Sequence, residues 1–377
     1  MFAKQALLVL VGTLGLVAAK TTTEKNPTQA EIDAARATVL PYSPVSNVKG
    51  LAFDRFVNIW LENTDFETAA SDANLSKLAK EGILLANYYA VTHPSEPNYS
   101  NVSTIADLFD TKHIAWGEYQ EDMPHAGYQG MRYPLRGPNQ YVRKHNPLAL
   151  YDSVTKDAVR PRQIKNFTTL YEDLAHRSLP QHLFITPNMT NDAHDTNITN
   201  QHFTNNSLVL VTFDEGGNYS YPNRVFSFLV GGAIPKDLKG TTDDTFYTHY
   251  SIIASLSANW GLPSLGRWDC GANLLKLVAE KTGYVNWEVD TSNAYINQTY
   301  PGPLSNKHYS SKWAVPATKG KCSAGHGIAE VVKKTYHGLH PTYNYTSPVP
   351  YDTTTGNNVG IKYHRTLHGK EESGITG

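Results

Sequence analysis

The sequence predicts an α/β fold with a mostly parallel central sheet and helices on both faces. Short apolar segments alternate along the chain with segments of helical periodicity, and strands separated by helices are typical of parallel sheets. Residues 208–213 (LVLVTF) are apolar on both faces, as expected for a central strand that is covered on both sides. The chain has 377 residues, which is enough to bury a large core.

Five segments are expected to form strands: residues 55–61, 83–91, 183–185, 208–213 and 225–230. Helices are expected at 74–81, 249–260 and 272–281, because apolar residues recur there at helical spacing and a glycine lies just beyond each segment. Residues beyond about 345 are polar and rich in Thr and Gly, so we expect a loose tail there.

The N-terminus predicts export from the cell. Lys4 precedes an apolar run at 6–17 and the small residues Ala18 and Ala19, which is the layout of a signal peptide; the alternative is a buried N-terminal helix. No later segment reaches the ~18 apolar residues that a membrane helix needs. The expected organisation is a signal peptide at 1–19, a leader segment at 20–50, a folded domain at 51–345 and a polar tail at 346–377.

Two further features agree with a protein secreted into the extracellular space or cell wall. Cys270 and Cys322 are expected to form a disulfide in an oxidising compartment and to tie down the C-terminal segment. Asn-X-Ser/Thr sequons predict N-linked glycans. They include Asn74, Asn101, Asn166, Asn188, Asn197, Asn205, Asn297 and Asn344.

The charge balance excludes a nucleic-acid-binding surface as the main feature of the chain. Lys and Arg number 33 against 34 Asp and Glu, a net charge of −1, which gives no basic footprint for nucleic acid. The 15 histidines make the chain strongly cationic once the pH falls below about 6. That change would suit an anionic substrate handled in acid.

Polar clusters follow four predicted strands at the point where each strand ends. Glu62 and Asn63 follow the first strand, residues 93–99 the second, residues 188–195 the third, and Asp214 and Glu215 the fourth. Open α/β sheets place their ligand sites at this edge. The four clusters therefore predict one site.

The acidic residues of this edge suggest a metal site. Carboxylates directly after a buried strand are costly unless they are paired or bind a cation. Glu62, Asn63, Asp214 and Glu215 form an oxygen-rich set that suits a divalent metal ion, and Ca, Mn, Fe and Zn all remain open. The alternative is a strand end followed by helix-capping acids.

Ser95 is the candidate nucleophile. It stands in a stiff frame between Pro94 and Pro97, and a neighbouring metal would favour its alkoxide without a histidine base. Asn98 could donate its amide to a developing anionic oxygen. The alternative is a proline-bounded turn with an incidental serine.

Histidines supply the candidate proton donor. His194 lies close to Asp192 and Asp195, the composition of a proton donor or anion holder that carboxylates position; the alternative is a solvated loop. His249, at the start of a predicted helix, is a weaker candidate of the same kind. His93 is interpreted as structural.

These segments resemble the phosphoesterase family of secreted fungal acid phosphatases and bacterial phospholipases C. The similar segments are 61–66 (LENTDF), 93–99 (HPSEPNY), 190–195 (TNDAHD) and 212–217 (TFDEGG). Residues 260–270 (WGLPSLGRWDC) are similar to the fungal acid phosphatase branch in particular. The similarity runs from about residue 40 to residue 345, in order along the chain.

The resemblance implies an alkaline-phosphatase-like fold for a phosphoesterase domain at 51–345, and a role for each matching residue. Ser95 would be the nucleophile that becomes a phosphoserine, and His194 would lie near the leaving group. The implied metal ligands are Glu62, Asn63, Asp214 and Glu215, and Asn98 matches a residue that contacts phosphate. The residues themselves add Asn191, Asp192 and His249 as further candidates for substrate binding.

The chain departs from the family pattern at two places. Family segments are missing after Tyr99 and between Asn197 and Leu208. The first gap removes a helix whose N-terminus should help to bind phosphate, and it creates a sequon at Asn98.

The function predicted from these observations is a secreted, metal-dependent phosphatase that hydrolyses small phosphomonoesters, with an acid optimum. One alternative is a phosphodiesterase or phospholipase C that uses the same site, although no large apolar insertion is available to engage lipid. The other is a catalytically inactive secreted homologue, because of the two gaps.

Overall fold

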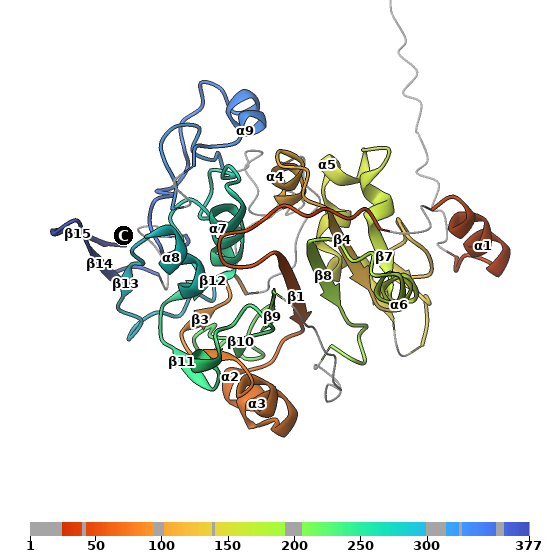
Figure 1. The fold of residues 1–377 in the computed structure, drawn as a ribbon, viewed down its shortest axis with the longest axis horizontal. Helices are drawn as coiled ribbons and strands as arrows, with labels where there is room; N and C mark the ends of the chain where they lie inside the picture. Colours follow the sequence, from red (N-terminus) through yellow and green to blue (C-terminus); the bar gives the residue numbers. More distant parts are fainter. Residues whose placement is uncertain are drawn as a thin grey trace, which may run out of the picture.

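The structure is a computed structural model that describes residues 25–39, 43–93, 102–137, 140–192, 206–298, 314–323, 326–351 and 358–376. Its centre is an eight-stranded sheet in the order β11-β2-β10-β9-β1-β8-β4-β7 (Figure 1). The strands are β1 Arg55–Leu61, β2 Ile83–Leu85, β4 Trp116–Gln120, β7 Ile164–Asn166, β8 His182–Thr186, β9 Ser207–Phe213, β10 Ser227–Val230 and β11 Thr241–Asp243.

The sheet is mostly parallel, as predicted. Only β10 runs against its neighbours β2 and β9, and all other pairings are parallel. The central pair β1 and β9 is in register from Arg55↔Ser207 to Leu61↔Phe213, so both strands end at the same edge. Every residue of β9 is buried, which explains its continuous apolar sequence.

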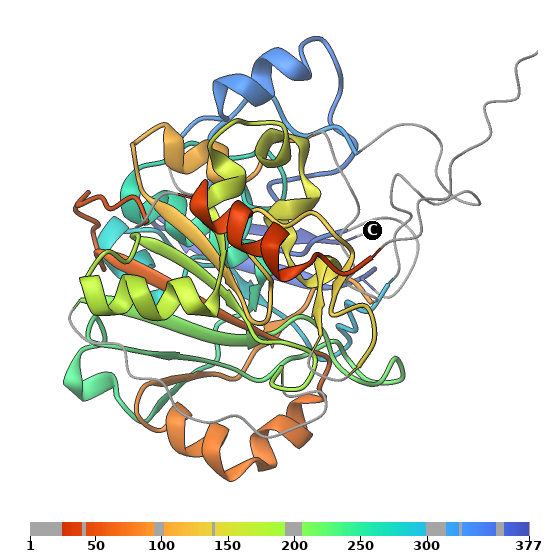
Figure 2. The ribbon, with the colours of Figure 1, turned by 90° about the vertical axis from the view of Figure 1, so that its right-hand side faces the viewer.

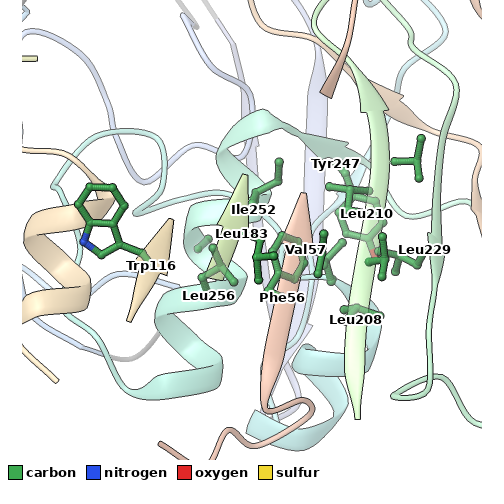
Figure 3. Packing of buried hydrophobic residues seen from close by; sticks show 14 of the residues in the cluster. Phe56, Val57, Trp116, Leu183, Leu208, Leu210, Leu229, Tyr247, Ile252 and Leu256 are labelled. Carbon is green, nitrogen blue, oxygen red and sulfur yellow. The ribbon is translucent and has the colours of Figure 1, made fainter. Parts of the chain in front are cut away.

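Helices cover both faces of the sheet. The helix α7 His249–Trp260 packs Ile252 and Leu256 near Phe56 and Leu183 of the sheet (Figure 3). The helix α6 Phe167–His176 lies on the opposite face, where its Asp173 accepts a hydrogen bond from Tyr119 of β4; it is in the foreground of Figure 2. Burying each large apolar side chain stabilises the fold by roughly 1.5–3 kcal/mol. The two helical layers therefore stabilise the sheet that lies between them.

The remaining elements surround this core. The other helices are α1 Gln29–Ala37, α2 Phe66–Ser71, α3 Ala73–Ala79, α4 Ile105–Asp110, α5 Asp152–Thr155, α8 Lys276–Thr282 and α9 Glu330–Thr335. Small sheets pair β3 Tyr88–Tyr89 with β12 Tyr247–Thr248, β5 Arg132–Tyr133 with β6 Tyr141–Val142, and β13 Glu288–Val289 with the hairpin β14 Lys362–Leu367 and β15 Lys370–Ile375. Within the described ranges no helix is long and apolar enough to cross a membrane.

Three predicted elements differ from the structure. The strand expected at 83–91 is two strands, β2 and β3, and β3 pairs outside the main sheet. The helix expected at 272–281 begins only at Lys276, because Asn273 donates to the carbonyls of Phe246 and Trp287 instead of joining a helix. The helix expected at 74–81 ends at Ala79.

The expected loose tail beyond residue 345 contains the hairpin β14–β15. Its strands alternate exposed polar residues with inward ones, and Ile361 and Tyr363 are buried with Trp287 packed against them. The polar composition reflects the outer side of a hairpin that is covered on one face only.

The predicted disulfide is present. Cys270 and Cys322 are bonded over a sequence separation of 52 residues. Next to it, the backbone N–H and the hydroxyl of Ser323 both donate to the Cys270 carbonyl, at 2.7 and 2.8 Å. The bond therefore holds the segment after residue 314 against the end of the core.

Candidate active site

The ends of β1 and β9 bring the predicted acidic residues together. The Asp214 N–H donates to the Leu61 carbonyl at 2.9 Å, and the Thr64 N–H donates to the Glu215 carbonyl at 3.2 Å. Across the pair, Asn63 Nδ2 donates to Glu215 Oε1 at 2.7 Å. Parallel pairing over the full length of both strands therefore places the two motifs side by side, as the strand-end pattern predicted.

The segment after β8 joins the same edge through its backbone. The Glu62 N–H donates to the Asp192 carbonyl at 2.9 Å, and Asp192 is fully buried. Asn191, predicted to contact substrate, is exposed and donates from Nδ2 to Glu121 Oε1 at 2.9 Å. The structure thus places Asp192 inside the edge and turns Asn191 toward a neighbouring loop.

Glu62 has a partner that the sequence did not reveal. His145 Nε2 lies 2.9 Å from Glu62 Oε1, and the two side chains are 10% and 12% exposed. His145 ends a short 3-10 helix, Arg143–His145, which follows β6 outside the main sheet. Because no strand of the main sheet directly precedes His145, the strand-end pattern of the sequence carries no signal for it.

His249 contacts the backbone at the end of β9. Its Nε2 donates to the Asp214 carbonyl at 2.8 Å, and its Nδ1 accepts from the Tyr88 hydroxyl at 3.2 Å. Burial lowers its pKa to about 4, so the ring is neutral and both nitrogens are used within the protein. This placement favours a positioning role over the predicted contact with substrate.

His93 lies under an aromatic cover beside the acidic residues. The ring is buried, its Nε2 is 4.0 Å from Glu215 Oε1, and it stacks on Tyr219 with ring centroids 3.5 Å apart. Burial lowers the pKa of His93, partly offset by the charge of Asp65. These contacts agree with the interpretation of His93 as structural.

Three predicted site residues lie outside the described residues: Ser95, Asn98 and His194. The described residues that flank them, His93 and Asp192, are both at the acidic edge. The roles assigned to the three remain predictions.

The four predicted ligands do not form a closed metal site. Within the described ranges, no three or more His, Cys, Asp or Glu side chains are grouped so that they could hold one. Glu62 faces His145 and Glu215 faces Asn63, so each of these carboxylates has a protein partner. The four predicted ligands share one edge and offer the oxygen chemistry that suits a hard or borderline cation, but the Asn63 amide presents its nitrogen, not its oxygen, to Glu215.

A cleft of about 610 Å³ opens at this edge. Its lining is polar and comes from the segments after β1 and β9: Asn63, Thr64, Asp65, Thr68, Gly217, Asn218 and Tyr219. Gly217 is not required for space, since a Cβ there would make only ordinary contacts, 3.6 Å from Asp65 Oδ1. Of the four predicted ligands, Asn63 lines this cleft.

Comparison with known proteins supports the resemblance found in the sequence. Residues 99–263 match the model of the Phosphoesterase family. A phosphate-repressible acid phosphatase from Penicillium chrysogenum is 76% identical, and the alignment covers 97% of this chain and 98% of that protein. An acid phosphatase from Aspergillus niger is 61% identical and both chains are covered completely. A probable acid phosphatase from Kluyveromyces lactis is 44% identical over 94% of this chain and 92% of its own length.

The similarity is incomplete in two of these comparisons. The alignment with the Aspergillus niger protein extends over 416 positions, although this chain has 377 residues, so that relative has residues with no counterpart here. A solved alkaline phosphatase superfamily protein from Vibrio parahaemolyticus is similar at 13% identity and a TM-score of 0.35, over 60% of this chain and 73% of its own.

The near-complete coverage by relatives at 44–76% identity decides the assignment. The chain belongs to the phosphoesterase family, in the branch of the fungal acid phosphatases, and is a phosphoric ester hydrolase.

Proposed function

We propose that this protein is a secreted, metal-dependent acid phosphatase that hydrolyses phosphomonoesters through a phosphoserine at Ser95. One observation carries the proposal: the ends of β1 and β9 bring Asn63 Nδ2 within 2.7 Å of Glu215 Oε1. This contact supports the proposal because it joins the segments that follow β1 and β9, and Asn63 also lines the cleft. The names of the relatives support acid phosphatase activity.

Glu62, Asn63, Asp214 and Glu215 are proposed to hold a divalent cation. When bound, the ion would supply positive charge to the phosphoryl oxygens and favour the alkoxide of Ser95. Asn63 would have to present its Oδ1 rather than its Nδ2, and Glu62 would have to share its carboxylate between the ion and His145.

The chain's own residues carry the reaction steps. The Ser95 hydroxyl loses its proton to solvent, and its oxygen forms a bond to phosphorus while the bond from phosphorus to the leaving oxygen breaks. His194 gives the leaving oxygen a proton and regains one from solvent. Water then attacks the phosphoserine, releases inorganic phosphate and restores the Ser95 hydroxyl. Asn98 is assigned to an anionic phosphate oxygen, and Asp192 to the support of His194.

Two alternative functions use the same strand-end residues. A phosphodiesterase or phospholipase C would use the same residues, and a comparison of monoester with diester substrates separates it. A catalytically inactive homologue is favoured by one observation, the residues of the Aspergillus niger relative that have no counterpart in this chain. It would keep the metal ligands without forming the phosphoserine.

Hydrolysis of an aryl phosphate at pH 5 tests the proposal. We expect the purified protein to hydrolyse the aryl phosphate, to lose this activity with a chelator, and to regain it with added Mn²⁺, Fe²⁺, Zn²⁺ or Ca²⁺. Ser95→Ala should abolish turnover, whereas Ser103→Ala, outside the motif, should not. A folded protein that hydrolyses no aryl phosphate with any of these metals would favour the inactive homologue.

A further inference from the structure

Tyr219 both stacks on His93 and lines the cleft. Its ring stacks nearly parallel on the buried His93, at an interplanar angle of 11°, while Tyr219 itself is 55% exposed. An aromatic ring that is fixed from behind and exposed in front is a binding surface for another ring.

The loop that carries Tyr219 is held in place by backbone contacts. Asn297 Nδ2 donates to the carbonyls of Tyr219 and Tyr221, at 2.8 and 3.2 Å. The Asn218 N–H donates to Asp65 Oδ1 at 2.9 Å. The ring therefore needs little ordering when a ligand binds, which favours affinity.

Tyr219 lies close to the acidic edge. Asn63, which contacts Glu215, lines the same cleft as Tyr219, and the His93 ring under Tyr219 lies 4.0 Å from Glu215 Oε1. A phosphate bound at the acidic edge would leave its organic group beside Tyr219. The cleft volume of about 610 Å³ is within the range of small-molecule sites.

The lining also indicates the chemistry of that organic group. It contains amide, hydroxyl and aromatic side chains, and Asp65 is its one charged residue among those the structure describes. A second anionic group on the substrate would find no lysine or arginine there. The lining suits a neutral ring whose face can stack and whose edge can accept or donate hydrogen bonds.

We propose that Tyr219 is a specificity-determining residue that binds the ring of the substrate's alcohol, so that the enzyme prefers phosphomonoesters of ring-bearing alcohols over those of small open-chain alcohols. The inference rests on the proposed function for the position of the phosphate. It adds the substrate class that the site selects.

Equilibrium binding of two phosphonates tests the role of the ring without turnover. Titration calorimetry would compare phenylphosphonate with methylphosphonate on the wild type, Tyr219→Ala, Tyr219→Phe and Tyr221→Ala. Tyr221 is the matched control, because it is 57% exposed on the same loop and its carbonyl is held by the same asparagine. We expect Tyr219→Ala to weaken phenylphosphonate about three- to tenfold, to leave methylphosphonate unchanged, and Tyr219→Phe and Tyr221→Ala to change neither.

Kinetics provides the second readout and separates the two hypotheses. Tyr219→Ala should raise KM for phenyl phosphate but not for glycerol phosphate, with kcat unchanged, and glucose phosphate shows whether sugar rings use the same surface. Equal losses for both phosphonates would mean that Tyr219 only shields His93, and the inference would be wrong. No hydrolysis of any ester by a protein that still discriminates the phosphonates would overturn the proposed function and leave the inference standing.

Discussion

His145 Nε2 lies 2.9 Å from Glu62 Oε1, although the two residues are 83 positions apart and only Glu62 follows a strand of the main sheet. The segment that delivers His145 is anchored just beyond it, where the Leu148 N–H donates to Glu118 Oε1 at 3.2 Å. Glu118 is buried in β4. The central sheet therefore positions a histidine from outside the sheet against a predicted metal ligand.

His145→Ala is expected to lower kcat/KM for an aryl phosphate on the order of ten- to hundredfold, because a residue that orients a metal ligand is typically worth that much. Steady-state kinetics at saturating and limiting Mn²⁺ measures the effect. If His145 acts through Glu62, excess metal should restore part of the loss. His125→Ala, in the loop after β4, is the control and should keep its activity; equal losses in both variants would contradict the assignment.

Glu118→Gln is expected to stabilise the protein near neutral pH. Burial raises the pKa of Glu118 to about 8, well above the 4.5 of an exposed glutamate, so between these two pH values the folded state keeps a proton that the unfolded state releases. Stability from this group is present below pH 4.5 and is lost as the pH rises through about 8. Glutamine keeps the oxygen that accepts from Leu148 and never ionises.

Denaturant unfolding at pH 4.5 and pH 7.5 measures this effect. The variant should match the wild type at pH 4.5 and exceed it at pH 7.5, by at most a few kcal/mol. The same difference at both pH values would show that Glu118 does not titrate in this window.

The elements predicted correctly are those whose pattern is local. β9 is apolar at almost every position, and α7 runs from His249 to Trp260 before a glycine in the left-handed conformation, Gly261, as expected. β4 was missed because its sequence, WGEYQ, contains Glu118 and Gln120, yet all five residues are buried. Their burial depends on partners such as Leu148 and Thr186, which lie far away in the sequence.

The same contrast between local patterns and long-range contacts applies to the site. The strand-end pattern placed Glu62, Asn63, Asp214 and Glu215 at one edge, because parallel strands that end in register bring their next residues together. It could not find His145, which no strand of the main sheet introduces. It also could not show that the His249 ring lies behind the edge, since that depends on its contact with the Asp214 carbonyl.

Asp173→Ala is expected to destabilise the protein by about 3–5 kcal/mol, the usual cost of removing one partner of a buried ion pair. Asp173 Oδ2 lies 3.8 Å from Lys165 Nζ, and both side chains are almost completely buried. The carboxylate also accepts from the Tyr119 hydroxyl at 2.6 Å and from the Ser43 N–H at 3.0 Å, which ties the N-terminal leader to α6. Thermal and denaturant unfolding measure the loss.

A double-mutant cycle, with Lys165→Met added to Asp173→Ala, measures the coupling between these two residues. Removing the second charge should recover part of the stability, because Lys165 is then no longer buried without a counter-charge. Additive losses would contradict a coupled pair.

Glycans are expected at Asn74 and Asn344 and not at Asn166 and Asn188 in the secreted protein. The first two are exposed. Asn166 and Asn188 are 6% and 4% exposed, and their Nδ2 atoms donate to the Met123 carbonyl and to Asp122 Oδ2, at 3.1 and 2.5 Å. A glycan would replace a hydrogen on that nitrogen and need a path to solvent, so folding and modification exclude each other there.

Peptide mass spectrometry after enzymatic deglycosylation measures which sites carry glycans, with Asn74→Gln and Asn344→Gln as controls for the two exposed sequons. Each control should lower the mass of the secreted protein by one glycan. Modification of Asn166 or Asn188 in folded, active protein would show that the buried placement of that residue is wrong.

His182→Phe is expected to make the fold less sensitive to acid. Burial lowers the pKa of His182 to about 3, from the 6.5 of an exposed histidine, so between these pH values the unfolded state binds a proton that the folded state excludes. Stability from this neutral ring is present above pH 6.5 and is lost as the pH falls toward 3, at up to about 1.4 kcal/mol per pH unit. His249, whose pKa is lowered to about 4, contributes with the same sign.

Unfolding of the wild type and His182→Phe at pH 7 and pH 4.5 measures this slope. Phenylalanine keeps a ring against Phe56 and Phe109, which contact His182 at centroid distances of 6.1 and 4.8 Å, but it cannot bind a proton. The stability lost between the two pH values should be smaller in the variant, and an unchanged slope would exclude His182 as its source. An acid-active phosphatase with this fold would work where its buried histidines oppose folding, so its lower pH limit should be set by unfolding before it is set by the acidic site.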